Sequence, residues 1–250
     1  MNSSKLMYIF GLTAILGLVA VAPGAPRAVT IDDFTVAYPA HPDLPVSGAE
    51  MIFVGSMCDG GACPPGLLVY HMVSDASHQM GLSGVLGGER SATIHYVTGT
   101  ANSYILTDLG WMTMNHNAGA KAWMDLTYGE TVNLNANLST SATKFIVSVA
   151  SGDMYAGPRP VPCTITVTSK RGTPQQATAS VTVSLINETD YDFLFASFVG
   201  IDFSDVDMIS YRFDASNVSS VDFGIGPLRT DGPTVPTDES TWGEVKSLYE

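Results

Sequence analysis

The sequence predicts an all-β protein, a sandwich or barrel of antiparallel strands. Short segments in which apolar residues alternate with Thr or Ser recur along the chain, as in strands with one buried face. Gly and Pro turn signals separate these segments. No long segment repeats its apolar residues with a helical period, which argues against βαβ units.

Composition supports this fold class and excludes some partners. The 250 residues include 24 Gly and 14 Pro, as expected for many short strands joined by tight turns, and only 14% are charged. The formal net charge is −13, with 11 Lys and Arg against 24 Asp and Glu. Nucleic acids and anionic lipids are held mainly by Lys and Arg, so we expect neither as a partner. The acidity itself favours solubility.

Residues 1–28 read as a secretory signal peptide. Lys5 supplies a positive start, Leu6 to Val21 is almost wholly apolar, and Ala20-Val21-Ala22 offers small residues for cleavage. The alternative is an uncleaved membrane anchor, for which an apolar run of about 16 residues is short. We therefore expect a secreted or cell-surface protein with no transmembrane segment in the mature chain.

The expected strands follow the alternating pattern. They are Thr30–Val36, Met51–Val54, Leu67–Val73, Ala92–Val97, Ser103–Thr107, Ala122–Tyr128, Lys144–Val149, Cys163–Thr168 and Thr178–Leu185.

Export permits disulfides, so the three cysteines matter. Cys58 and Cys63 flank a short Asp-Gly-Gly-Ala loop, and their small separation along the chain favours a disulfide between them. Pairing of Cys163 with one of the two is the alternative. A zinc site is not expected there, because no second pair of Cys or His ligands follows.

The segment Val85 to Val97 joins a double-glycine turn to an alternating strand. Gly87 and Gly88 can adopt the positive φ values of a tight turn. Glu89 and Arg90 are neighbours, so on a strand they face opposite sides and need separate partners. Arg90 is a candidate ligand-binding residue; the alternative, which we favour, is a structural base paired with a carboxylate.

This segment also carries a resemblance. Val-Leu-Gly-Gly-Glu-Arg at 85–90 resembles a motif of secreted bacterial β-sandwich proteins, many of which are sorted by a PEP-CTERM signal. Ile31 to Phe34, Val199 to Phe213 and Val221 to Ile225 are similar to other stretches of those proteins. The resemblance implies a jelly-roll-like sandwich, distantly similar to carbohydrate-binding modules, and no catalytic residue. Ser91 departs from the Asp common at that place in the family.

Sequence signatures of catalysis are absent: there is no nucleophile elbow, zinc-protease motif or glycine-rich phosphate loop. We expect no cofactor, apart from a candidate structural calcium. Asp202, Asp205 and Asp207 are close in sequence, and carboxylates are the ligands that calcium prefers. The alternative is that these aspartates cap turns.

Two tryptophans are candidate ligand-binding residues. Sugar-binding surfaces use exposed aromatic faces, which makes Trp111 and Trp123 candidates for glycan contact. Large aromatics also fill sandwich cores, and the alternating pattern around Trp123 favours that alternative.

We predict a β-sandwich domain over 29–230 and a Pro/Thr-rich linker with a short tail over 231–250. The end of the chain resembles short Trp-Gly-x-x-Lys-x-Leu-Tyr tails of secreted bacterial proteins, and it lacks the elements of a PEP-CTERM tail. A fraying end is the alternative.

Three functions remain open from the sequence. The first is a secreted, non-enzymatic sandwich that binds an extracellular polysaccharide or another envelope component. The second is a structural protein of the cell envelope or matrix, displayed through its tail. The third is a secreted polysaccharide-active enzyme. Function cannot be taken from the fold alone.

Overall fold

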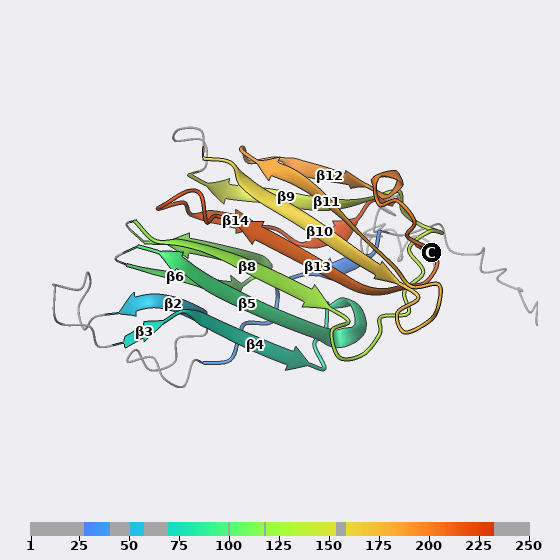
Figure 1. Ribbon diagram of the computed structural model, residues 1–250, viewed down its shortest axis with the longest axis horizontal. Helices are drawn as coiled ribbons and strands as arrows, with labels where there is room; N and C mark the ends of the chain where they lie inside the picture. The colour runs from blue at the N-terminus through green and yellow to red at the C-terminus, as the bar shows by residue number, and fades with distance from the viewer. Residues whose placement is uncertain are drawn as a thin grey trace, which may run out of the picture.

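A computed structural model describes residues 28–40, 51–57, 70–99, 101–117, 119–153 and 159–232. These residues form two antiparallel β-sheets packed face to face, which confirms the predicted all-β sandwich (Figure 1). The helical structure among these residues is two short 3-10 turns, η1 (Leu86–Gly88) and η2 (Phe195–Ser197). No helix among the described residues is long and apolar enough to cross a membrane.

One sheet has nine strands, in the order β1-β15-β9-β14-β7-β6-β2-β3, with β12 also paired to β9. Its strands are β1 (Thr30–Asp32), β2 (Met51–Met57), β3 (Tyr70–Met72), β6 (Asn102–Asp108), β7 (Trp111–His116), β9 (Lys144–Gly152), β12 (Asp190–Leu194), β14 (Phe223–Ile225) and β15 (Leu228–Thr230).

The other sheet has six strands, in the order β11-β10-β13-β8-β5-β4. Its strands are β4 (Ser74–Met80), β5 (Glu89–Thr98), β8 (Lys121–Tyr128), β10 (Val161–Ser169), β11 (Ala177–Leu185) and β13 (Val206–Asp214).

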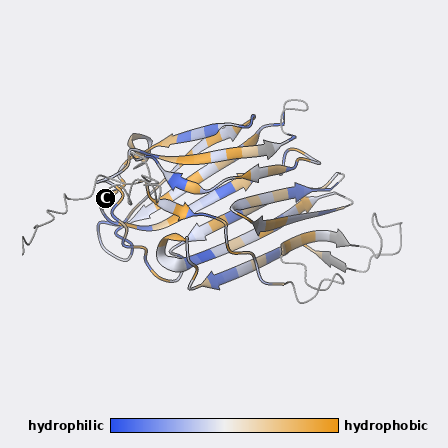
Figure 2. Ribbon diagram, turned by 180° about the vertical axis from the view of Figure 1, so that it is seen from behind, coloured by the Kyte–Doolittle hydropathy of each residue, from blue (hydrophilic) through white to orange (hydrophobic). Residues whose placement is uncertain are grey.

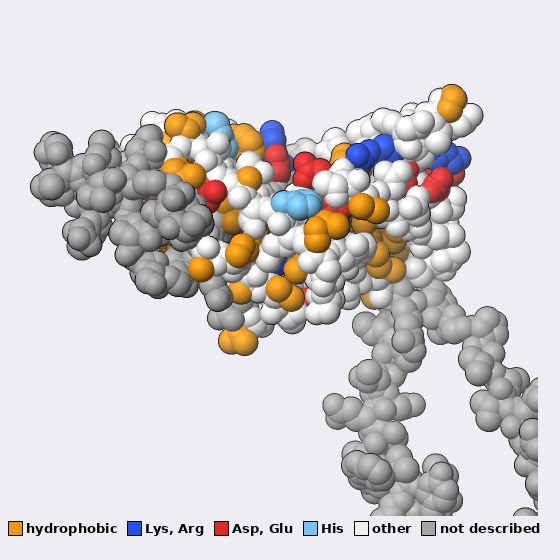
Figure 3. All heavy atoms as spheres, turned by 90° about the horizontal axis from the view of Figure 1, so that it is seen from below, with side chains coloured by type: hydrophobic (Ala, Val, Ile, Leu, Met, Phe, Trp, Pro, Cys, Tyr) orange, Lys and Arg blue, Asp and Glu red, His pale blue; other side chains and the backbone are white. Residues whose placement is uncertain are grey.

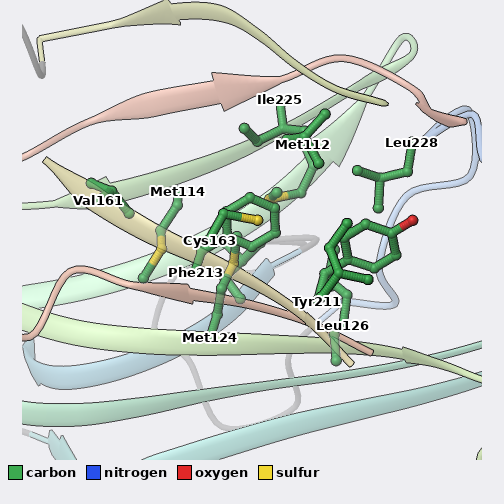
Figure 4. Close-up of a cluster of buried hydrophobic side chains, with 14 of the residues drawn as sticks. Met112, Met114, Met124, Leu126, Val161, Cys163, Tyr211, Phe213, Ile225 and Leu228 are labelled. Carbon is green, nitrogen blue, oxygen red and sulfur yellow. The ribbon is translucent and has the colours of Figure 1, made fainter. Parts of the chain in front are cut away.

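The core lies between the sheets because alternate residues of each strand point inward. Hydrophobic and hydrophilic residues alternate along the strands in Figure 2. Figure 4 shows how the inner faces meet: Met112, Met114 and Ile225 come from the nine-stranded sheet. They face Met124, Leu126, Val161, Cys163, Tyr211 and Phe213 from the six-stranded sheet.

The predicted double-glycine turn is present. Gly87 and Gly88 have φ of 71° and 69°, and β5 begins at the next residue. Beyond it, Ala92, Ile94 and Tyr96 are buried, so the predicted alternation of this strand is confirmed.

The first strand is shorter than predicted. β1 ends at Asp32, whose carboxylate accepts a hydrogen bond from the backbone N–H of Phe34 at 2.8 Å. Asp33 makes the same local contact with Thr35 at 3.0 Å. These aspartate turns compete with strand pairing and bend the chain away from the sheet.

Strands β4, β7, β12, β13 and β15 were not among the expected strands. β4 is an edge strand whose sequence is mostly polar, so it lacks the apolar alternation used to find strands. β12 and β15 have only five and three residues, too few to show a period.

A buried ion pair joins the two sheets at one end of the sandwich. Arg90 and Asp32 are both fully buried, and their side chains approach to 3.3 Å. Tyr128 donates a hydrogen bond from its hydroxyl to Asp32 at 2.9 Å. Arg90 also donates to the Gln79 side chain at 2.7 Å and to the carbonyl of Val36 at 2.6 Å. Arg90 is therefore structural and paired with a carboxylate, as the favoured reading predicted.

Burial raises the pKa of Asp32 above its usual value, and the neighbouring Arg90 guanidinium opposes that shift. The carboxylate thus depends on Arg90 and its other hydrogen-bond donors to remain charged in the interior.

A second buried polar pair lies in the nine-stranded sheet. Ser103 and His116 lie 2.8 Å apart between Oγ and Nδ1, and Nε2 of His116 has no hydrogen-bond partner. His116 is 2% exposed and Ser103 is fully buried, so a substrate does not reach this pair. Burial lowers the pKa of His116 to about 4, and the charge of Asp153 opposes that shift.

We expect the Arg90→Met variant to lose about 3–5 kcal/mol of unfolding free energy, because it leaves the Asp32 carboxylate buried without its cation. Urea unfolding followed by circular dichroism measures the loss. Arg212→Met is the control, since the Arg212–Asp125 pair has a half-exposed arginine and its loss should cost about 1 kcal/mol or less. Equal losses in the two variants would contradict a special role for the buried pair.

His116 should make stability depend on pH. Its pKa is about 4 when folded and near 6.5 when unfolded, so the unfolded chain binds more protons between these values. Its contribution therefore weakens as pH falls from 6.5 to 4, by up to about 3 kcal/mol. Urea titrations of the wild type and of His116→Gln should diverge across this window. Parallel curves would show that His116 does not titrate as described.

Candidate functional site

Trp111 occupies an exposed position on the outer face of the nine-stranded sheet. It is the first residue of β7, in which Met112 and Met114 point into the core. Trp111 therefore points outward, and it is 46% exposed. Single exposed apolar residues are common on proteins, so the surroundings of this ring decide its meaning.

The turn before β7 sets the position of Trp111. Leu109 and Gly110 connect β6 to β7 and have φ of 49° and 89°, the positive values of a two-residue hairpin of type I′. Leu109 is unfavourable in such a position, and it is 84% exposed. The hairpin thus exposes two large apolar side chains, Leu109 and Trp111.

The ring of Trp111 lies close to the backbone of Gly226. Ile225 pairs with Met112 in antiparallel register, so the next residue, Gly226, lies beside Trp111. A Cβ built on Gly226 would lie 3.5 Å from Cζ3 of Trp111 and 3.5 Å from Cβ of Ser148. Gly226 itself is buried. The indole therefore lies against a backbone without a side chain, and about half of the Trp111 side chain is exposed to solvent.

A hydrogen-bonded polar cluster lies on the far side of Gly226. Arg229 donates to Oγ of Ser148 at 2.7 Å and to the Asp190 carboxylate at 2.9 Å. Ser148 donates to the same carboxylate at 2.5 Å. Arg229 and Asp190 are partly exposed, so their remaining donors and acceptors can meet a ligand. We call Trp111, Ser148, Asp190, Arg229 and Gly226 the Trp111 platform.

Trp123 lies on the opposite side of the sandwich. It faces outward from β8, whereas the neighbouring Met124 is buried. His95 of β5 stacks on its ring at 5.0 Å, and the guanidinium of Arg212 of β13 lies 4.3 Å from the ring centre. β5 and β13 flank β8 on opposite sides, so both faces of this ring are covered. The prediction that Trp123 belongs to the core is wrong, and it shares no site with Trp111.

Arg90 does not reach a surface ligand, because its side chain is fully buried in the ion pair with Asp32. The ligand-binding reading of Arg90 is therefore replaced by the structural one.

Two of the three candidate calcium ligands, Asp202 and Asp207, have separate partners. Asp202 pairs with Lys170 at 2.7 Å and caps a turn by accepting from the backbone and hydroxyl of Ser204. These donors lower the pKa of Asp202. Asp207 is buried and accepts from the backbone N–H of Arg171. In the described part of the chain, none of the three aspartates belongs to a group of three metal-ligating side chains.

Cys58 and Cys63 lie outside the described residues, so their disulfide stays a prediction. Cys163 is buried in the core without a disulfide partner, and burial raises the pKa of its thiol.

No protein-family model matches the chain, and no curated protein matches it either. Several solved structures are similar to it. One is a family 11 carbohydrate-binding module from Clostridium thermocellum in complex with a β-1,3-1,4-mixed-linked tetrasaccharide. It is 12% identical, with a TM-score of 0.32, over 73% of this chain and 97% of that chain. Another is a family 29 carbohydrate-binding module complexed with mannohexaose, which is 14% identical with a TM-score of 0.29. That match covers 63% of this chain and 91% of the other. Both similarities are too remote to transfer a ligand or a residue role.

Proposed function

We propose that this protein is a non-catalytic glycan-binding protein whose binding surface is the Trp111 platform. The observation that carries the proposal is an indole that lies against Gly226 and is 46% exposed. The C–H groups on one face of a pyranose ring are apolar and pack on such an aromatic surface. Ser148, Asp190 and Arg229 supply hydrogen-bonding groups for sugar hydroxyls beside it.

The charge of the protein narrows the class of glycan. With a formal net charge of −13, the chain repels polyanions at long range. On the platform itself, the one cation, Arg229, is already paired with Asp190. Neutral polysaccharides are therefore the proposed ligands, and uronic-acid polymers are not.

The Trp111→Ala variant should bind glycan at least about 10-fold more weakly, a loss of about 1.4 kcal/mol, as expected for a central aromatic contact. Affinity gel electrophoresis against mixed-linkage β-glucan, xyloglucan and galactomannan identifies a retained ligand, and titration calorimetry then gives the affinities. Ligand binding should also change the tryptophan fluorescence of the wild type but not of Trp111→Ala.

Trp123→Ala is the matched control, since it removes an outward-facing tryptophan from the opposite sheet. It should bind within about two-fold of the wild type, because the sandwich separates it from the platform. Undiminished binding by Trp111→Ala would refute the platform. Failure of the wild type to bind any neutral polysaccharide would refute the function.

We also propose that the protein acts outside the cytoplasm after removal of residues 1–28, ahead of the sandwich domain over 29–230 and the tail over 231–250. The described sandwich is consistent with these limits, because β1 begins at Thr30 and β15 ends at Thr230.

Expression of the full chain in a bacterial host should release a protein that lacks the first 28 or so residues, as N-terminal sequencing and intact mass would show. Deleting Leu6–Val21 should keep the protein in the cytoplasm at full length, since the apolar region is needed for export. An intact N-terminus on the wild-type protein outside the cell would contradict the proposed cleavage.

A further inference from the structure

Three potential metal ligands converge at the β4 edge of the six-stranded sheet. His78 lies on β4, Glu89 begins β5, and Glu130 follows β8; these three strands are neighbours in the sheet. One ligand atom from each residue lies within 4.8 Å of the other two. No other group of three such ligands occurs among the described residues. Figure 3 views this edge, where acidic and histidine side chains share the surface.

Glu89 is held rigidly. Its Oε1 accepts hydrogen bonds from the backbone N–H and the hydroxyl of Thr131, both at 2.9 Å, and its Oε2 accepts from the N–H of Val132 at 3.3 Å. The side chain is 1% exposed. The carboxylate is thus fixed before any ion arrives, which lowers the entropy lost on binding.

His78 is oriented by a hydrogen bond outside the cluster. Its Nδ1 lies 2.7 Å from Oγ of Ser91, the residue paired with it on β5. The tautomer in which Nδ1 donates leaves the Nε2 lone pair available. Nε2 lies 3.8 Å from Oε1 of Glu89, longer than a hydrogen bond. Metal-ligating histidines commonly use the second ring nitrogen in this way.

The backbone that carries Glu130 is also braced. Arg171 donates to the carbonyls of Gly129 and Glu130 at 2.8 and 2.9 Å. Gly129 has φ of 80°, and a Cβ there would lie 2.3 Å from the carbonyl oxygen of Asp207. Only glycine fits this close approach, which turns the chain back toward Glu89.

The charge of the cluster is not balanced by the protein. No Lys or Arg in the described part of the chain forms an ion pair with Glu89 or Glu130. Two carboxylates and an imidazole therefore form a site with one nitrogen and two oxygen ligands for a cation. Ligands of a tetrahedral Zn²⁺ lie about 3.3 Å apart, so a small movement of the exposed His78 and Glu130 side chains closes the site.

We propose that His78, Glu89 and Glu130 bind one divalent metal ion of the Zn²⁺ type, with water in the remaining position. The imidazole ligand favours Zn²⁺ and similar transition metals over Ca²⁺, which takes oxygen ligands alone. The bound ion links the edge strand β4 to β5 and to the 129–132 turn. This site is on the six-stranded sheet, so it is independent of the Trp111 platform.

The test measures binding of Zn²⁺ to the untagged protein after a chelator has removed any metal. Titration calorimetry gives the affinity, and metal analysis after dialysis gives the number of ions bound per chain. We expect one ion per chain and a higher melting temperature with Zn²⁺ than with Ca²⁺ at the same concentration. His78→Ala and Glu130→Gln should each weaken binding by more than about 10-fold. Ser91→Ala should weaken it by about 10-fold, through loss of the hydrogen bond that orients His78.

The matched control variants replace a histidine and a glutamate that lie outside the proposed site. His95→Ala and Glu188→Gln should leave Zn²⁺ affinity unchanged, because neither residue belongs to the cluster. Co²⁺ bound in place of Zn²⁺ should show d–d absorption without the charge-transfer bands of cysteine ligands.

Circular dichroism of each variant separates loss of the site from loss of folding, and the exposed Glu130 makes its variant the least disruptive. No stoichiometric binding by the wild type would overturn the proposal. So would thiolate bands with Co²⁺, or full affinity in the folded Glu130→Gln variant.

Discussion

The buried pair of Arg90 and Asp32 is the constraint on which this sandwich depends. It joins β5 of one sheet to β1 of the other at a point where both charges are removed from water. Such a pair is stable only if each group finds further hydrogen bonds. Gln79, Val36 and Tyr128 provide them, so β4, the segment after β1 and β8 must all be in place together. The Gly-Gly-Glu-Arg motif thus specifies an architecture: Arg90 points to this pair, and Glu89 points to the other side of the strand, where its carboxylate binds the backbone of Thr131 and Val132.

The two outer faces of the sandwich differ in how far their outward-facing tryptophan is covered by neighbouring side chains. On the six-stranded sheet, Trp123 has His95 on one face and Arg212 on the other, and Arg212 is also bonded to Asp125. The ring of Trp123 is thus covered by its neighbours, and the charge of Arg212 is paired with Asp125. On the nine-stranded sheet, Trp111 lies against a glycine and has open surface beside it. The polar groups of both faces are hydrogen-bonded among themselves, so the exposed indole of Trp111 is what distinguishes the face on which we propose glycan binding.

Much of the architecture could be predicted from the sequence because alternation and turn chemistry are local. The strand that follows Gly87-Gly88 and the inward direction of its alternate residues are examples. Local patterns did not reveal β4, whose edge position needs no apolar face, or the proximity of His78 and Glu130, which are 52 positions apart in the chain. The partner of Arg90 was expected to be a carboxylate, but its identity as Asp32 depended on the pairing of distant strands.

The sequence by itself determined the all-β class, the acidic surface charge and the turn at Gly87-Gly88, since each follows from residue type and short-range spacing. Only the tertiary structure decided which outward-facing tryptophan is open. Trp111 and Trp123 both lie on alternating strands, and their environments differ only through neighbours contributed by other strands. The same holds for Asp202 and Asp207, which are close in sequence but bind different partners. Sequence proximity fixes the separation of backbones, whereas strand register fixes which side chains meet.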